Sequence, residues 1–314
     1  NRLLDQASRQ LFMAESNEEM LACTWNRWFS IMFKRITKHE VPKSGAESGW
    51  QKIDWEEVLR IIDKSPQSDK QLRSEYLVID EGQDMPFQFY RALMRLGYQN
   101  FYVVADYNQQ IIEGEQSNRP DHQTLFYDEE EENEVIDLQL NYRNSYPTAK
   151  LAQYFYTGPS SEPVSLPDKS RISKRPILLE YGKEGQPTFN KIIKRIIKTA
   201  DAYSSRLLGI ITPDHKVREK YLKALKEVGH EMKDSLDHGL PNIQTYASNC
   251  AEKLRFDEGG IMVITAPSCK GLEFDTVFLA DIDQHHCRQG IVDNKRRLFY
   301  VMVSRAIGNV IMLK

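Results

Sequence analysis

Short runs of apolar residues alternate along the chain with segments in which apolar residues return at helical spacing. Such runs are typical of strands in a parallel sheet that is buried on both faces. The predicted strands cover residues 76–79, 101–105, 135–140, 176–180, 207–211, 261–265, 276–280 and 310–313. The predicted helices cover residues 55–62, 86–96, 191–202 and 215–228. This alternation predicts an α/β fold built on parallel sheets.

The chain has 314 residues, which exceeds the usual size of one domain. Two domains of about 150 residues are therefore expected. An acidic run at 128–132 is interpreted as a solvated loop. Strand character returns just after it, so the boundary is predicted near Asp137, with domains at 1–136 and 137–314. Residues 1–7 read as the middle of a helix, because no capping residue or turn precedes them.

Composition narrows the class of protein. Hydrophobic residues make up 40% and charged residues 28%, as in ordinary soluble globular proteins. No apolar run approaches the ~20 residues that span a bilayer, and no signal peptide pattern is present, so no membrane partner is expected. The net charge of −3 means that a nucleic acid would have to be held by a local basic groove. The basic residues of the helices at 191–202 and 215–228 are interpreted as a solvated face.

The four cysteines, Cys23, Cys250, Cys269 and Cys287, show no C-x-x-C pair and no metal-ligand spacing. This pattern predicts reduced thiols in the cytoplasm. The neighbouring residues 285–287 read His-His-Cys, but adjacent side chains rarely converge on one ion, so no metal site is expected there.

Paired carboxylates follow the apolar run at 76–79. Asp80 and Glu81 would lie at the carboxyl end of a parallel strand, where open α/β sheets bind ligands. Asp80 would hold Mg²⁺ through water, and Glu81 would orient and deprotonate an attacking water. A plain acidic turn is the alternative for an isolated Asp-Glu pair.

Two further polar segments carry candidate chemistry. Gln109 follows the strand at 101–105, and its amide can sense a γ-phosphate by hydrogen bonding. In the segment 141–144, the ring of Tyr142 can stack on a base and Arg143 can bind a phosphate with two hydrogen bonds. The alternative is that Tyr142 belongs to the core and Arg143 to a surface ion pair.

Residues 265–275, between two predicted strands, contain groups that suit an anionic ligand. Gly271 permits close approach of the backbone, and Lys270 and Thr265 can contact an anionic backbone. Glu273 can accept hydrogen bonds from a ribose or stabilise the turn. We therefore predict a binding segment here.

Near the C-terminus, Arg297, Val301 and Arg305 are spaced at i, i+4 and i+8. This spacing predicts that both guanidinium groups project from one helix face. Two arginines that point into a cleft suit arginine-finger chemistry, in which their charge offsets the negative charge that develops on a transferred phosphoryl group.

Taken in order, these segments resemble the motifs of superfamily 1 helicases of the UvrD, Rep and PcrA kind. Residues 80–84 match motif II, 105–109 motif III, 141–143 motif IV, 268–275 motif V and 296–305 motif VI. The resemblance implies a P-loop NTPase helicase core of two RecA-like parallel-sheet domains. ATP and Mg²⁺ would bind in the cleft between them, and single-stranded DNA or a single-strand/duplex junction would lie across their top.

The resemblance also implies roles for single residues. Tyr142 would stack on adenine, Glu273 would contact the ribose, and Gly271 and Arg297 would lie on the nucleotide side. The γ-phosphate would be contacted by Gln109, Arg143 and Arg305. DNA would be contacted by Thr24, Trp25, Trp28, Thr265 and Lys270. Because Trp25 and Trp28 also fit a helical pattern at i and i+3, a core position is the alternative for both.

Two departures from the family pattern bear on the candidate site. No G-x-x-x-x-G-K-[ST] loop occurs in the chain. In the family that loop immediately precedes a helix, so its lysine is expected just upstream of Asn1, and residues 1–314 alone are expected to bind ATP weakly and hydrolyse it negligibly. A protein that never had the loop is the alternative. Pro267 also stands where the family usually has His, which removes a potential DNA contact.

The sequence thus predicts most of the motor of an ATP-dependent DNA helicase or translocase. A non-catalytic nucleic-acid-binding or assembly subunit that keeps the helicase fold is one alternative. A P-loop switch ATPase that does not move on DNA is another.

Overall fold

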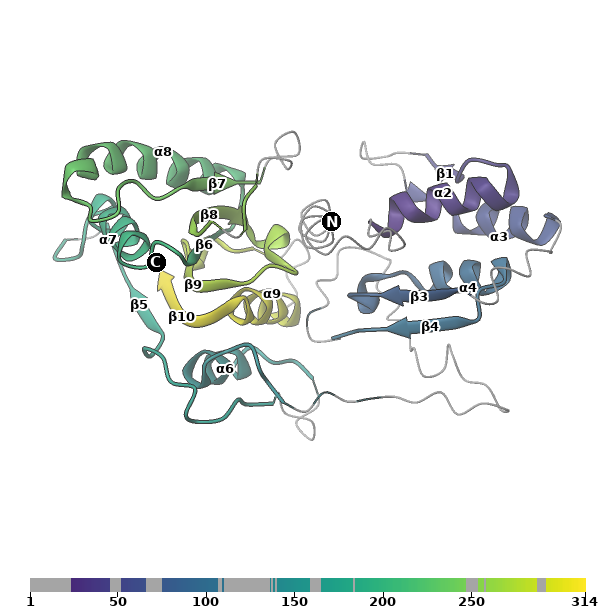
Figure 1. Cartoon of the computed structure of the whole chain (residues 1–314), viewed down its shortest axis with the longest axis horizontal. Helices are drawn as coiled ribbons and strands as arrows, with labels where there is room; N and C mark the ends of the chain where they lie inside the picture. The colour runs from purple at the N-terminus through teal and green to yellow at the C-terminus, as the bar shows by residue number, and fades with distance from the viewer. Residues whose placement is uncertain are drawn as a thin grey trace. The chain divides into compact units, whose positions relative to one another are not determined.

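The computed structural model of the chain describes residues 24–45, 52–65, 75–106, 109, 136, 138, 140–158, 165–182, 184–246, 254–256, 258–286 and 292–314. These residues form two compact units, coloured purple to blue and teal to yellow in Figure 1. The N-terminal unit ends before Leu138, and the C-terminal unit runs from Leu138 to Lys314. The assignment of residues 1–136 and 137–314 to two RecA-like domains stays a prediction.

The C-terminal unit is built on a six-stranded sheet, in which every described pair of neighbouring strands is parallel. The strand order is β5-β10-β9-β6-β8-β7. The strands are β5 (Ile177–Leu179), β6 (Leu207–Thr212), β7 (Ile243–Thr245), β8 (Gly260–Thr265), β9 (Phe274–Leu279) and β10 (Ala306–Leu313). Since all strands point the same way, their carboxyl ends meet at one edge of the sheet.

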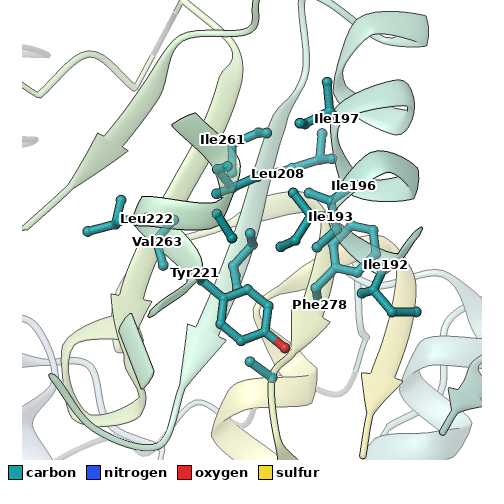
Figure 2. Packing of buried hydrophobic residues seen from close by; sticks show 14 of the residues in the cluster. Ile192, Ile193, Ile196, Ile197, Leu208, Tyr221, Leu222, Ile261, Val263 and Phe278 are labelled. Carbon is teal, nitrogen blue, oxygen red and sulfur yellow. The ribbon is translucent and has the colours of Figure 1, made fainter. Parts of the chain in front are cut away.

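The core of this unit lies between the sheet and helices α7 (Phe189–Ala202) and α8 (His215–Met232). Figure 2 shows Ile193 and Ile196 of α7 and Tyr221 of α8 near Leu208 and Phe278 of the sheet. Every residue of β6 and β8 is buried, as expected for central parallel strands. The buried sheet therefore fixes the positions of the polar residues that lie just before and just after its strands.

Two further helices, α6 (Tyr146–Gln153) and α9 (Val292–Ser304), pack on each other and on β10. Short 3₁₀ turns complete the unit at η4 (Lys233–Ser235), η6 (Ala266–Cys269) and η7 (Ile282–Gln284). The loop before α6 is tied to the sheet, because Asn144 Nδ2 donates to Ser304 O (3.1 Å) and Ala306 O (2.7 Å).

The N-terminal unit contains two parallel strands, β3 (Tyr76–Ile79) and β4 (Asn100–Val103), joined through η2 (Gly82–Asp84) and α4 (Phe87–Leu96). Helices α2 (Trp25–Thr37) and α3 (Trp55–Lys64) and the antiparallel pair β1 (Lys43–Ser44) and β2 (Lys52–Ile53) accompany them. The core gathers around the buried rings of Phe29, Phe33, Phe89 and Tyr90.

One face of the β3–β4 pair is open, which contradicts the expectation of a strand buried on both faces. Tyr76 is 78% and Val78 74% exposed, and Tyr102 is also exposed, whereas Leu77 and Ile79 pack on the core. Among the described residues only one face of these strands is covered by the core, so burial alternates along β3.

The predicted strands and helices are otherwise confirmed within a few residues, with one error. A strand over 135–140 is wrong for the described residues, because Ile136, Leu138 and Leu140 are exposed and outside any strand. Helix α6 and strands β1, β2 and β7 were not expected. The predicted helix over 1–7 and the acidic loop at 128–132 lie outside the described residues. Within the described part of the chain, no helix combines the length and the apolar character that a membrane span requires.

Candidate active site

The carboxylates that follow β3 lie on a tight turn. Asp80 is exposed, and its Oδ1 accepts a hydrogen bond from Glu81 N at 2.9 Å. Glu81 has φ of 55°, in the left-handed region that a non-glycine residue rarely adopts. A Cβ on Gly82 would lie 2.3 Å from Val103 Cγ1, so only glycine fits between the turn and β4. Backbone strain of this kind is concentrated at functional sites.

A chain of hydrogen bonds connects this turn to the end of β4. Gln83 Nε2 donates to Glu81 Oε2 at 2.6 Å, and Gln83 Oε1 accepts from Asp106 N at 3.0 Å. Gln109 Nε2 then donates to Asp106 Oδ2 at 2.7 Å. The predicted base Glu81 and the predicted sensor Gln109 are therefore brought together through Gln83 and Asp106, whose roles no sequence pattern indicated.

The groups at this turn fit a magnesium ion. Asp80 and Glu81 offer carboxylate oxygens, the ligands that Mg²⁺ prefers, and Asp80 is exposed enough to bind it through water. A bound ion would neutralise negative charge on the transferred phosphoryl group. No group of three or more His, Cys, Asp or Glu side chains that could hold a metal occurs within the described ranges.

A second set of predicted residues gathers at the amino ends of β9 and β10 in the C-terminal unit. Arg143 Nε lies 2.6 Å from Glu273 Oε1, and both side chains are partly exposed. Phe274 N donates to Arg305 O at 2.9 Å, which places Arg305 beside this ion pair. An exposed ion pair is worth little, about 0–1 kcal/mol, so both groups can exchange each other for a ligand at small cost.

Arg305 does not project from the face of a helix, as the spacing predicted. Helix α9 ends at Ser304, and Arg305 follows it with 1% of its surface exposed. Its Nε donates to Val301 O (3.2 Å) and its Nη2 to Ser304 Oγ (3.1 Å). Arg297 lies on α9 itself, partly buried, where its Nε donates to Thr157 Oγ1 at 3.0 Å. The two guanidinium groups therefore differ in exposure and partners.

The segment 265–275 is divided between the two ends of the sheet. Thr265 ends β8, level with Thr212 at the carboxyl end of β6, whereas Glu273 precedes the amino end of β9. Thr265 and Lys270 are both buried, and Gly271 has a φ of 79° that favours glycine. The structure thus separates Thr265 from Glu273 by the length of the sheet, and the DNA contacts assigned to Thr265 and Lys270 stay predictions.

Tyr142 is 75% exposed, so its ring is accessible for stacking. Its loop is held by Arg171, whose Nη1 donates to Tyr142 O and whose Nη2 donates to Arg143 O at 3.3 Å. Arg171 could not be predicted from the sequence, because a lone arginine outside any motif carries no local signal. Arg171 orients the loop that carries the predicted adenine and phosphate contacts.

The tryptophans assigned to DNA pack on the core of the N-terminal unit. Trp25 lies 5.2 Å from Phe89, edge to face, and stacks on Trp55 at 6.5 Å between ring centroids. Trp28 lies 5.8 Å from Tyr98. Both rings are partly buried, and Thr24 precedes the helix without capping it through its side chain. These contacts favour the core alternative, and a DNA role for the three residues stays a prediction.

We expect Trp25→Ala to lower the free energy of unfolding of the full-length protein by about 3 kcal/mol, because the two aromatic contacts and the burial of the ring are lost. Urea unfolding measures this change, and single-strand binding by the folded protein measures the DNA role. Ile31→Ala, an exposed apolar position on the same helix, is the control. An unchanged unfolding energy with binding weakened about 5- to 150-fold would instead restore the stacking role.

Two buried ionisable groups near the sheet are kept neutral. Burial raises the pKa of Cys269 to about 12, so its thiol is inert. Burial also lowers the pKa of His285 to about 4, and its Nε2 lies 3.0 Å from Ala280 O. His286 is exposed. Residues 23, 250 and 287, the other cysteines, lie outside the described residues.

Because His285 is neutral in the folded protein, we expect the free energy of unfolding to fall in acid. Its folded pKa, about 4, is below the ordinary 6.5, so the unfolded chain takes up the proton first as the pH falls. Stability is therefore full above pH 6.5 and is lost on the way to pH 4, by about 3 kcal/mol for this group. Denaturant unfolding across this range should show a shallower loss in His285→Gln than in the wild type. Equal losses would exclude His285 as the cause.

The parallel sheet, the paired carboxylates and the ordered set of polar segments define an α/β protein of the helicase type. The chain belongs to the family of UvrD-like helicase C-terminal domains, whose sequence model matches residues 19–313. The match extends over both compact units.

Two solved structures are similar to parts of the chain. One is the C-terminal domain of a possible DNA helicase from Lactobacillus plantarum WCFS1, with 17% identity, a TM-score of 0.37, and coverage of 55% of this chain and 86% of that one. The other is the DUF1998 helicase MrfA bound to DNA, with 12% identity, a TM-score of 0.40, and coverage of 76% of this chain and 31% of that one. No curated protein matches the chain.

Proposed function

We propose that this chain belongs to an ATP-dependent DNA helicase or translocase, which couples ATP hydrolysis to movement on single-stranded DNA. The observation that carries the proposal is the hydrogen-bonded set at the carboxyl ends of β3 and β4. There, Glu81 and Gln109 are linked through Gln83 and Asp106. A base and a phosphate sensor that share one network can respond together to the state of the nucleotide.

In this proposal Glu81 accepts a proton from the attacking water, whose oxygen bonds to the γ-phosphorus as the bond to the β-phosphate oxygen breaks. Asp80 would hold Mg²⁺ through water, and Arg143 and Arg305 would contact the γ-phosphate. Tyr142, Glu273, Gly271 and Arg297 hold the rest of the nucleotide. Binding and hydrolysis of ATP in each cycle would alternately strengthen and weaken the contacts of the protein with DNA, and so advance the protein along the strand.

A second candidate is a non-catalytic nucleic-acid-binding or assembly subunit. It is favoured by the burial of Arg305, whose guanidinium group already donates to Val301 O and Ser304 Oγ within its own unit. In this second candidate Arg305 acts as a structural contact rather than as a finger.

The test is ATP turnover by the full-length protein with and without single-stranded DNA. Turnover that rises on addition of DNA supports the motor. Turnover that DNA leaves unchanged would point to a switch ATPase, and DNA binding without turnover would point to the non-catalytic subunit.

A further inference from the structure

We infer that Gln83 is the positioning residue that holds the Glu81 carboxylate and ties it to Asp106 and Gln109. This inference rests on the proposed function, because it assigns how the hydrolytic base of that reaction is held. Gln83 has no exposed surface. Both ends of its amide make hydrogen bonds, to Glu81 Oε2 at 2.6 Å and from Asp106 N at 3.0 Å.

The two partners determine the orientation of the amide. The amide nitrogen is a donor only, and it faces the carboxylate of Glu81, which is an acceptor when ionised. The amide oxygen is an acceptor only, and it faces the N–H of Asp106, a donor. The reversed amide would place oxygen against carboxylate and N–H against N–H. Gln83 therefore holds Glu81 in one position.

The connection continues beyond Gln83 into the segment that carries the predicted sensor. The backbone N of Asp106 donates to Gln83 Oε1, and Asp106 Oδ2 accepts from Gln109 Nε2 at 2.7 Å. Backbone hydrogen bonds also join the turn to the end of β4. Gly82 N donates to Val104 O at 2.8 Å, and Val104 N donates to Ile79 O at 2.9 Å. A displacement of Gln109 can thus reach Glu81 through Asp106 and the amide of Gln83, while the backbone of the turn stays anchored to β4.

The test compares Gln83→Met, which keeps the length and loses both hydrogen bonds, with Tyr90→Phe. Tyr90 Oη donates to Gly82 O at 2.9 Å, so its loss loosens the same turn without touching Glu81. In the full-length protein with saturating single-stranded DNA, Gln83→Met is expected to lower kcat about 10- to 100-fold. KM for ATP and the melting temperature should stay close to those of Tyr90→Phe.

A double variant separates positioning from a general structural role. In the Glu81→Gln background, Gln83→Met should have no further effect on kcat, because the base that it positions is already lost. If Gln83→Met fails to fold, Gln83→Glu serves instead, since it keeps the length and the acceptor for Asp106 N but replaces the donor to Glu81 with a carboxylate oxygen, which repels the Glu81 carboxylate. Its kcat is expected to fall similarly.

Three results would overturn the inference while leaving the proposed function intact. The first is a wild-type kcat in the Gln83 variants. The second is a loss of kcat in Tyr90→Phe as large as that in Gln83→Met. The third is a loss of kcat on adding Gln83→Met that is the same in the wild type and in the Glu81→Gln background. A wild-type protein that does not hydrolyse ATP would overturn the proposed function and this inference with it.

Discussion

Glu81→Gln is expected to lower kcat for ATP by at least about 100-fold in the full-length protein, with much smaller changes in nucleotide affinity. The amide of the variant keeps an oxygen that can accept the hydrogen bond from Gln83 Nε2, so the turn should be preserved. Only the ability to take a proton from water is removed. Because that proton moves in the transition state, the loss should appear in kcat rather than in binding.

The measurement is steady-state ATP turnover with saturating single-stranded DNA, together with equilibrium binding of a non-hydrolysable ATP analogue. Glu57→Gln is the matched control, because Glu57 is a carboxylate of the same unit that pairs with Arg60 on α3. This surface pair is expected to contribute little to stability and nothing to turnover. A kcat near that of the control would remove Glu81 from the role of base.

Arg305→Lys is expected to lower kcat by about 10³-fold or more, the range found when an arginine finger is lost. Lysine retains a positive charge and an apolar stem but lacks the planar fork that can bind two oxygens of a phosphoryl group. Arg305→Ala is less informative, because Arg305 is almost fully buried and truncation would also leave a cavity.

Arg218→Lys is the control for this substitution. Arg218 is also largely buried, and its Nη1 donates to a backbone carbonyl, Tyr246 O, at 2.8 Å. A similar fall in melting temperature for both variants, with kcat lost only in Arg305→Lys, supports the finger. Unchanged kcat in both would favour the non-catalytic subunit.

The central sheet of the C-terminal unit could be predicted because its strands are continuous apolar runs. Strands β6 and β8 are buried along their whole length, and their only polar residues are the threonines at their carboxyl ends, Thr212 and Thr265. Strand β7 gave no such signal. Its middle residue, Gln244, is polar, and its amide exchanges hydrogen bonds of 2.7 Å with the backbone of Arg255. This edge strand forms because it pairs with β8, and a local sequence pattern does not reveal such pairing.

The error over 135–140 has a related cause. Alternating apolar residues predict a strand with one buried face, but Ile136, Leu138 and Leu140 are all exposed. Periodicity records which side chains share a face and does not record whether anything covers that face. The same limit explains why β3 was correctly placed but wrongly expected to be buried on both faces.

In the candidate site, the position of the carboxylates could be predicted because chain direction alone places Asp80 and Glu81 at the end of β3. The role of Gln83 could not, because its second partner, Asp106, is 23 residues away. The burial of Arg305 could not be predicted either. It depends on where α9 ends, and helical spacing by itself continues through Ser304 without a break.

The open face of β3 and β4 has a practical consequence for handling the protein. Tyr76, Val78 and Tyr102 present large apolar side chains to water, and among the described residues β3 pairs only with β4, which leaves its other edge unpaired. Exposed apolar strands with free edges recruit other strands and promote aggregation. The protein is therefore expected to aggregate through this face at high concentration, and dilute samples are the better choice for biochemical work.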